Sequence, residues 1–203
     1  MKTIIIAGMP ASGKTTVSKR LSEAFGFPIL EKDAIKEELF DVIGFQEYSQ
    51  KRLMDVAATA VLLRCADSLL ASGSSLIMVN NFRDTVQQQV QDMLDRSGSK
   101  CVTVFFSGDA DVFYKRYVER DLRHERHLGH VLQDRYPPLP GDPLEYTMTR
   151  EEFAEKFEKL GMNEFHINGI RRLDVDATYP EQVNFEELFH QIQNLLDSNE
   201  ERV

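Results

Sequence analysis

Short apolar runs alternate with longer amphipathic segments along this chain. The runs predict strands, and they cover residues 3–7, 28–31, 76–79, 102–106 and 173–175. The first, third and fourth runs contain almost no polar residues, which is typical of parallel strands covered on both faces. Between the runs, apolar residues recur at the helical period and predict helices over residues 14–25, 34–40, 48–71, 85–97, 110–126, 150–160 and 185–197. The alternation predicts an open α/β sheet with right-handed crossovers.

Local sequence signals mark several of the expected boundaries. The segment Thr149-Arg150-Glu151-Glu152 fits a capping box, and Gly161 can end the helix that follows it. Asn168-Gly169 is a hairpin signal, so we expect an antiparallel neighbour for the last strand. Residues 133–146 are rich in proline and predict an irregular loop. At 203 residues we expect one domain, 1–203.

The first strand runs directly into a glycine-bounded turn of the form G-x-x-x-x-G-K-[ST]. Its glycines allow a sharp turn whose backbone N–H groups point inward, and the helix that follows adds partial positive charge. The lysine reaches the β- and γ-phosphates of a nucleoside triphosphate, and the first threonine can ligate Mg²⁺. The candidate nucleotide-binding residues are Gly8, Met9, Pro10, Ala11, Ser12, Gly13, Lys14, Thr15 and Thr16.

Asp33 ends the second strand and begins a helix. In an α/β sheet this places it beside the phosphate loop, at the edge where ligands bind. A carboxylate at this point can accept a proton from an incoming hydroxyl and can help to hold Mg²⁺ through water, together with Thr15. The position alone is equally consistent with a helix N-cap.

Residues 111–130 are rich in arginine and histidine. On a helix, Arg116, Arg120, Arg123 and His127 would share one stripe, with Arg126 to one side. Guanidinium groups stabilise a phosphate during transfer, so Arg120, Arg123 and Arg126 are candidate catalytic residues. The alternative is a solvated helix face whose acidic residues form local pairs. The glycine and prolines that follow favour a movable flap, and we expect a lid and flexible loop over residues 120–146.

The third strand ends in Asn80-Asn81, where many proteins with this loop carry a metal-holding aspartate. Two interpretations stay open. Thr15 and Asp33 can suffice for the metal, or the two amides can face the second substrate. A plain turn at the end of the strand explains Asn81 equally well.

Taken together, the stretches GMPASGKTT, EKDAIKEELF, RYVERDLRHERHLGH and LDVDAT resemble the small P-loop kinases related to polynucleotide kinase, chloramphenicol phosphotransferase, zeta toxin and gluconate or shikimate kinase. The resemblance implies a P-loop nucleoside-triphosphate hydrolase fold with a five-stranded, mainly parallel sheet and an arginine-bearing lid. It implies ATP and Mg²⁺ as cosubstrate and metal, Asp33 as the base, and Arg120 and Arg126 as lid arginines. By the same resemblance, Asp176, Ala177 and Thr178 are candidates for contact with the adenine, although a simple strand exit explains them nearly as well.

Composition limits the partners. The net charge of −9 and the pI near 5.1 argue against a surface that serves a nucleic-acid backbone. The short apolar run at the N-terminus fits neither a signal peptide nor a membrane span, so we expect a cytoplasmic protein. We also expect the protein to be a monomer or a homodimer. The helix over residues 48–71 can line an acceptor pocket, form a dimer seam or be buried in the core. Its charged residues Lys51, Arg52, Asp55 and Arg64 are candidates for acceptor selectivity.

The sequence therefore favours a Mg²⁺-dependent P-loop kinase that moves the γ-phosphate of ATP to a hydroxyl of a small molecule. One alternative is a 5′-hydroxyl polynucleotide or nucleoside kinase, which the acidic balance disfavours. Another is a non-catalytic protein in which ATP gates a binding surface, and the missing acidic residue at the end of the third strand supports it.

Overall fold

The computed structural model describes residues 1–145 and 148–198, and residue 146 of the predicted loop lies outside them. The strands are β1 Lys2–Gly8, β2 Ile29–Glu31, β3 Leu76–Val79, β4 Lys100–Ser107 and β5 Arg171–Asp176. The helices are α1 Lys14–Phe25, α2 Lys32–Ile43, α3 Tyr48–Ala71, α4 Gln87–Ser97, α5 Ala110–Leu122, α6 Leu128–Val131, α7 Arg150–Glu158 and α8 Phe185–Asp197, with short 3-10 helices at Asp84–Val86 and Pro180–Gln182.

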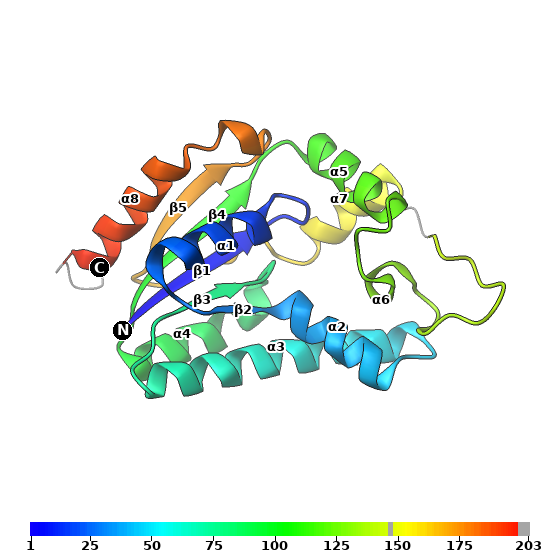
Figure 1. Ribbon diagram of the computed structural model, residues 1–203, viewed down its shortest axis with the longest axis horizontal. Coiled ribbons are helices and arrows are strands. Elements are labelled where there is room, and N and C mark those ends of the chain that lie inside the picture. Colours follow the sequence, from blue (N-terminus) through cyan, green and yellow to red (C-terminus); the bar gives the residue numbers. More distant parts are fainter. Residues whose placement is uncertain (146–147, 199–203) are drawn as a thin grey trace.

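The strands form one sheet in the order β2-β3-β1-β4-β5, and every pairing within it is parallel. Helices cover both faces, with α1 and α8 on one side and α3 and α4 on the other (Figure 1). This confirms the α/β architecture. It also explains why the central runs carry no polar alternation, because neither face of the sheet meets water.

The period-2 geometry of β1 divides the core into two layers. Ile4 and Ile6 are fully buried against the α1 and α8 side, whereas Ile5 and Ala7 are fully buried against α3 and α4. A third cluster forms at the far end of the molecule, where Phe40 of α2 meets α3 and the segment around α6. Gly129 is the point of closest approach there, since an added Cβ would lie 2.2 Å from the Phe40 ring.

Two expectations about local structure were wrong. The helix predicted to reach residue 126 ends at Leu122, because His124 takes a left-handed conformation with φ of 52° and reverses the chain. The hairpin predicted at Asn168-Gly169 is a tight turn, closed by a bond from the Ile170 N–H to the Ile167 carbonyl. Within the described residues β5 pairs only with β4, in parallel. The capping box at Thr149 is present with both of its bonds.

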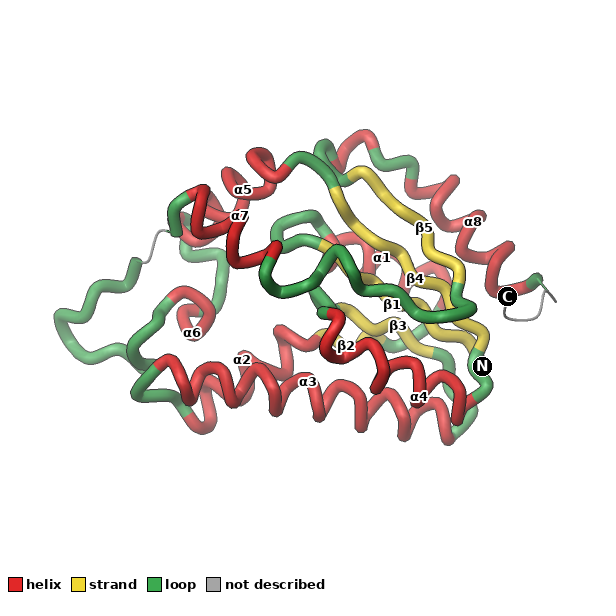
Figure 2. Tube along the Cα trace, turned by 180° about the vertical axis from the view of Figure 1, so that it is seen from behind, coloured by secondary structure: helices red, strands yellow, loops and turns green. Residues whose placement is uncertain are grey.

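Figure 2 shows the sheet from behind, and because every pairing is parallel, all of its strands end at the same edge. At that edge lie the turn after β1, the start of α2 after β2 and the Asn80-Asn81 segment after β3. The fold therefore collects the candidate residues at the carboxyl ends of the strands, which is the ligand-binding edge of open α/β sheets.

Candidate active site

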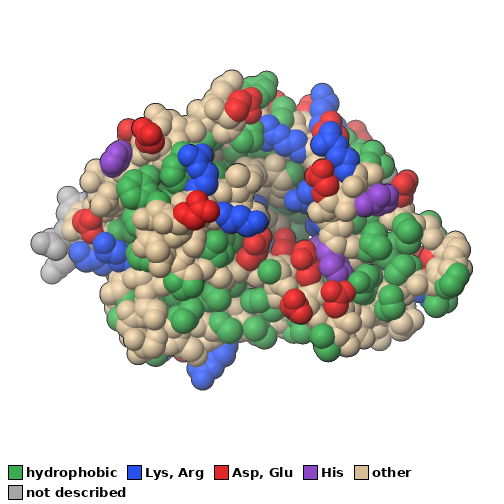
Figure 3. Space-filling model, in the orientation of Figure 1, with side chains coloured by type: hydrophobic (Ala, Val, Ile, Leu, Met, Phe, Trp, Pro, Cys, Tyr) green, Lys and Arg blue, Asp and Glu red, His purple; other side chains and the backbone are tan. Residues whose placement is uncertain are grey.

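A cleft of about 1280 Å³ opens at the carboxyl edge of the sheet. Figure 3 shows it as a hollow, with Lys and Arg side chains gathered beneath α5 and acidic side chains along the edge above α2. Its walls come from the turn after β1, the first turns of α2 and α3, the Asn80-Asn81 segment, α5 and α7. Its volume exceeds that of typical single-ligand pockets, about 300–1,000 Å³, so it has room for two substrates.

The turn after β1 is folded so that its amides face the cleft. Gly8 has a φ of 122°, and a Cβ there would lie 2.1 Å from the Phe106 carbonyl oxygen, so only glycine fits. Ala11 and Gly13 are also left-handed, with φ of 59° and 85°. No acceptor for the backbone amides of residues 11–13 occurs in the part of the chain that the structure describes. These amides and the N-terminus of α1 form a concave site suited to phosphate.

Lys14, the first residue of α1, is buried beneath this turn. Its ammonium group donates hydrogen bonds to the Gly8 carbonyl at 2.9 Å and to the Met9 carbonyl. Burial lowers the pKa of Lys14 to about 7, with Arg120 adding to the effect and Asp33 opposing it. The Lys14 ammonium has neutral carbonyl partners, and a phosphate bound at the turn would give it an anionic partner that favours its charged form.

The Thr15 hydroxyl donates a hydrogen bond to Glu31 Oε1 at 2.7 Å. This pair was not foreseen, because the sequence analysis placed Asp33 beside Thr15 for the metal. The signal was nevertheless present, since the spacing Glu31-Lys32-Asp33 at the end of β2 puts two carboxylates at one sheet edge. Hydroxyl and carboxylate oxygens are hard ligands, and Mg²⁺ is usually bound through one or two carboxylates, phosphates and water. The Thr15–Glu31 pair fits such an ion.

Asp33 lies in the first turn of α2 with 48% of its side chain exposed to the cleft. The N-cap of α2 is Glu31, so Asp33 is not the cap. Burial of its carboxylate favours the neutral form, but Lys32 and His130 outweigh that effect and hold its pKa below the usual range. Asp33 is therefore ionised at neutral pH.

Arg120 and Arg126 both reach the cleft, from α5 and from the segment after it. The Arg120 Nε is buried and has no partner within the described residues. Burial lowers the pKa of Arg120, and the neighbouring Arg126 adds to this. Arg126 lies over the Tyr117 ring at 4.9 Å and pairs with Asp121 at 3.5 Å. Arg120 is thus free to meet an anionic group, whereas Arg126 is already oriented by its neighbours.

Arg123 does not reach the cleft. Because α5 ends at Leu122, its guanidinium is turned outward, 66% exposed, and pairs with Glu119 and Glu125. The predicted arginine stripe is broken at the same point. Arg116 lines the cleft, but it donates hydrogen bonds to the backbone carbonyls of Ala177 and Thr178.

The remaining candidates are placed as follows. Asn80 and Asn81 line the cleft, and the Asn80 side chain accepts a hydrogen bond from the Asn81 N–H at 2.8 Å. Residues 176–178 follow β5, where the Asp176 carboxylate accepts from the Thr178 N–H. Whether any of them contacts a base or an acceptor stays a prediction.

A further group of cations in the cleft surrounds Asp55 of α3. Lys32 and Lys36 each approach Asp55 Oδ1 at 2.8 Å, and Arg83 approaches Oδ2 at 3.4 Å. Lys51 and Lys156 line the same part of the cleft. We call Lys36, Lys51, Arg83 and Lys156 the cationic cluster.

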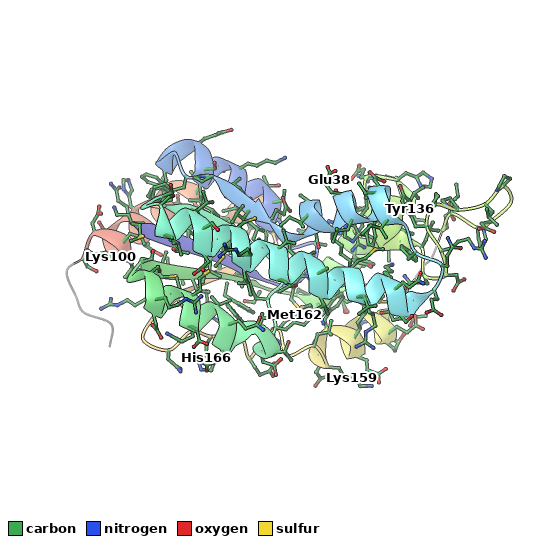
Figure 4. The ribbon with its side chains drawn as sticks, turned by 90° about the horizontal axis from the view of Figure 1, so that it is seen from below. Glu38, Lys100, Tyr136, Lys159, Met162 and His166 are labelled. Atoms are coloured by element: carbon green, nitrogen blue, oxygen red, sulfur yellow. The ribbon has the colours of Figure 1, made fainter. Side chains whose placement is uncertain are left out.

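Of the charged residues of α3 that the sequence singled out, Lys51, Arg52 and Asp55 line the cleft, whereas Arg64 is 79% exposed elsewhere and pairs with Asp67. Seen from below, α3 runs the length of the molecule between α2, which carries Glu38, and α7, with Lys159 at its end (Figure 4).

The described residues, 1–145 and 148–198, contain neither a membrane-spanning helix nor a cluster of metal-ligating side chains. No helix among them is long and apolar enough to span a membrane. They contain no group of three or more His, Cys, Asp or Glu side chains able to hold a metal without a substrate.

Comparisons with known proteins cover most of the chain. The model of the AAA domain family matches residues 4–137. A shikimate kinase from Mycobacterium ulcerans is 23% identical over 163 residues, which span 72% of this chain and 87% of the relative. The structure of a candidate kinase from Chloroflexus aurantiacus matches with a TM-score of 0.74 at 27% identity, covering 97% of this chain and 98% of that one. A gluconokinase from Sinorhizobium meliloti matches with a TM-score of 0.55 at 17% identity, covering 96% and 91%.

Proposed function

The chain belongs to the AAA domain family and has the fold of the small P-loop kinases, and we propose that it transfers the γ-phosphate of ATP to a hydroxyl group of a small molecule. The curated relatives named shikimate kinase and the structural neighbour named gluconokinase support this reaction type.

One observation supports the proposal: Asp33 lines the cleft together with the candidate phosphate-binding residues, and its neighbour Lys32 links it to the cations around Asp55, which we call the acceptor side of the cleft. Its carboxylate acts electrostatically on Lys14 and Arg120 on one side. On the other side it acts on Lys36 and on His130. An acceptor hydroxyl at Asp33 would therefore face the terminal phosphate of a nucleotide held by the P-loop.

Each residue has a role in the transfer. The hydroxyl oxygen of the acceptor forms a bond to the γ-phosphorus, the bond from that phosphorus to the β,γ-bridging oxygen breaks, and ADP leaves. Asp33 orients the hydroxyl and takes its proton, which passes to solvent. A carboxylate with a lowered pKa is a weak base. Phosphoryl transfer through a loose transition state nevertheless depends mainly on the positioning of the hydroxyl and on electrostatic stabilisation of the phosphate.

The charge that develops on the transferring phosphate is met from both sides. Lys14 and the amides of the P-loop would contact it, and so would Arg120 of α5, which lines the same cleft and whose Nε has no hydrogen-bond partner among the described residues. Thr15 and Glu31 would hold Mg²⁺, which neutralises phosphate charge when it is bound. Asp33 stays a candidate for contact with the same ion through water.

Phosphate transfer from labelled ATP tests the proposal. The acceptor panel would contain sugars, sugar acids, nucleosides and aminoglycosides. We expect Asp33→Asn to lower kcat by roughly 10²–10⁴-fold with ATP binding retained, and Lys14→Met to lose ATP binding. Asp92→Asn, an exposed substitution on α4, is the matched control. An unchanged kcat in Asp33→Asn would remove the assignment of Asp33. Tight ATP binding without transfer to any acceptor would instead favour a nucleotide-gated binding protein.

A further inference from the structure

The cationic cluster is larger than its one carboxylate partner requires. Lys36 and Arg83 share Asp55 with Lys32, so three cations meet one carboxylate. Within the described part of the chain, no carboxylate is in ion-pair contact with Lys51 or Lys156. Lys51 donates its hydrogen bonds to the backbone carbonyls of His130 and Leu132. Buried or half-buried cations in excess of their partners are costly unless an anion joins them.

The members of the cluster repel one another. Burial lowers the pKa of Lys156, and its cationic neighbours Arg126, Lys36 and Arg83 lower it further. Burial also lowers the pKa of Lys51 to about 7, with Lys36 and Arg126 contributing. The four members of the cluster come from α2, α3, α7 and the segment after β3. The convergence therefore arises from the tertiary fold and is not the solvated face of one helix.

The cluster is separate from the phosphate-binding group. The charges that act most strongly on Lys14 are those of Asp33, Arg120, Glu31 and Lys32. Of these, Lys32 also contacts Asp55, whereas the strongest charge effects on Lys51 and Lys156 come from Lys36 and Arg126. The nucleotide's phosphates thus have their own cations, and the cluster lies on the acceptor side of Asp33.

We propose that the cluster of Lys36, Lys51, Arg83 and Lys156 binds an anionic group of the phosphate acceptor, so that the acceptor is a hydroxyl-bearing carboxylate or phosphate ester and not a neutral molecule. This inference rests on the proposed function in one respect, namely that the bound anion belongs to the phosphate acceptor. The existence of an anion site is argued from the cationic cluster alone. Asp33 and Lys36 are three residues apart on α2, which is about 4.5 Å along the helix axis. The hydroxyl and the anionic group are therefore close together, in a compact molecule.

Calorimetric binding to the intact chain tests the site without relying on catalysis. A non-hydrolysable ATP analogue with Mg²⁺ first occupies the P-loop, so that the probes cannot bind there. The probes are matched pairs: sugar acids against the corresponding sugar alcohols, sugar phosphates against the parent sugars, and inorganic phosphate and acetate alone. The carboxylate and phosphate arms distinguish the two sources of the charge.

We expect the anionic member of at least one pair to bind about tenfold or more tightly than its neutral partner, and Lys156→Met and Arg83→Met each to weaken it by about tenfold. Lys115→Met, at an exposed position of α5 outside the cleft, should leave binding unchanged. In an active preparation the two cluster variants should raise the acceptor KM far more than the ATP KM.

The outcomes separate this inference from the proposed function. Binding of an anion that depends on Lys156 supports the site, even where no phosphate is transferred, and then only the kinase assignment fails. Equal binding or equal phosphorylation of neutral and anionic partners overturns the inference and leaves the kinase intact. Binding of no probe, or binding that Lys156→Met does not weaken, also overturns it. A correctly folded variant is verified by its retained affinity for the ATP analogue.

Discussion

Replacing Asp55 by asparagine removes the negative charge on which Lys32, Lys36 and Arg83 converge. The side chain keeps nearly its shape and volume, so the core around α3 is undisturbed. Its remaining carbonyl oxygen can still accept a hydrogen bond, but no charge balances the three cations. We therefore expect a loss of stability that is electrostatic in origin.

The structure sets the size of this loss. Two ammonium groups lie 2.8 Å from Asp55 Oδ1, and the Asp55 side chain is only 19% exposed, so solvent screens the pairs weakly. A hydrogen bond to a charged group contributes about 1.5–3 kcal/mol, and breaking a buried pair costs about 3–5 kcal/mol. Because asparagine retains part of the bonding, we expect a loss of about 3 kcal/mol at neutral pH. For a chain of this size that corresponds to a decrease in Tm of about 6–12 °C.

The assay is urea unfolding of both proteins, with the midpoint and the slope fitted separately. Asp67→Asn is the control on the same helix: Asp67 pairs with Arg64 at 3.8 Å and Arg96 at 3.1 Å, and its side chain is 33% exposed. Such surface pairs contribute about 0–1 kcal/mol. A loss in Asp55→Asn no larger than in Asp67→Asn would refute the reasoning.

The pH dependence gives an independent check. Burial opposes ionisation of Asp55, but Lys32 and Lys36 outweigh it and hold its pKa well below the usual range. A carboxylate whose folded pKa is depressed contributes stability above its unfolded pKa, and this is lost as the pH falls through the folded pKa. The difference between wild type and Asp55→Asn should be constant above about pH 4 and should shrink in stronger acid. A difference that persists unchanged in acid would point to a packing defect.

Two further predictions concern the nucleotide end of the cleft. Glu31→Gln should raise the Mg²⁺ concentration for half-maximal activity by about tenfold, while the exposed Glu23→Gln on α1 should not; equal Mg²⁺ curves would exclude Glu31 as a ligand. Because burial lowers the pKa of Lys14 to about 7, ATP binding above that pH must take up a proton and its affinity should fall as the pH rises, as calorimetry in buffers of different ionisation enthalpy would show. In Lys14→Arg any remaining affinity should be independent of pH in this range, and an unchanged slope would contradict the assignment.

Local patterns predicted most of the fold because the residues that form each element also mark it. The ends of α1, α3 and α8 coincide with the predicted ones, and the buried runs of β1, β3 and β4 lie in the sheet as expected. The end of α5 was missed because no glycine or proline marks it. The reversal at His124 comes with contacts of Arg126 back to Tyr117 and Asp121 of α5, which a helical period continued to residue 126 does not predict.

The same distinction between local and long-range contacts applies to the candidate site. The P-loop is one contiguous stretch, so the sequence indicates all of its residues at once, and their contact with a nucleotide stays a prediction. The pairing of Thr15 with Glu31 and the convergence of Lys36, Arg83 and Lys156 join residues that are distant in the chain. Such contacts depend on strand order and helix packing. Arg123 and Arg126 show the limit most clearly, because they are three residues apart, yet one points outward and the other into the cleft.

The chain has a net charge of −9, but its cleft is lined mainly by Lys and Arg among its charged side chains. The cleft and the outer surface therefore differ in the sign of their charge. Within the Debye length of its outer surface, about 10 Å at 0.1 M salt, the excess negative charge of the protein repels an approaching anion, and at larger distances this repulsion is screened. Only inside the mouth of the cleft does it encounter attraction. Added salt should therefore speed the encounter and at the same time weaken the complex once formed. We expect long polyanions to bind poorly, because most of their length would remain at the negatively charged outer surface.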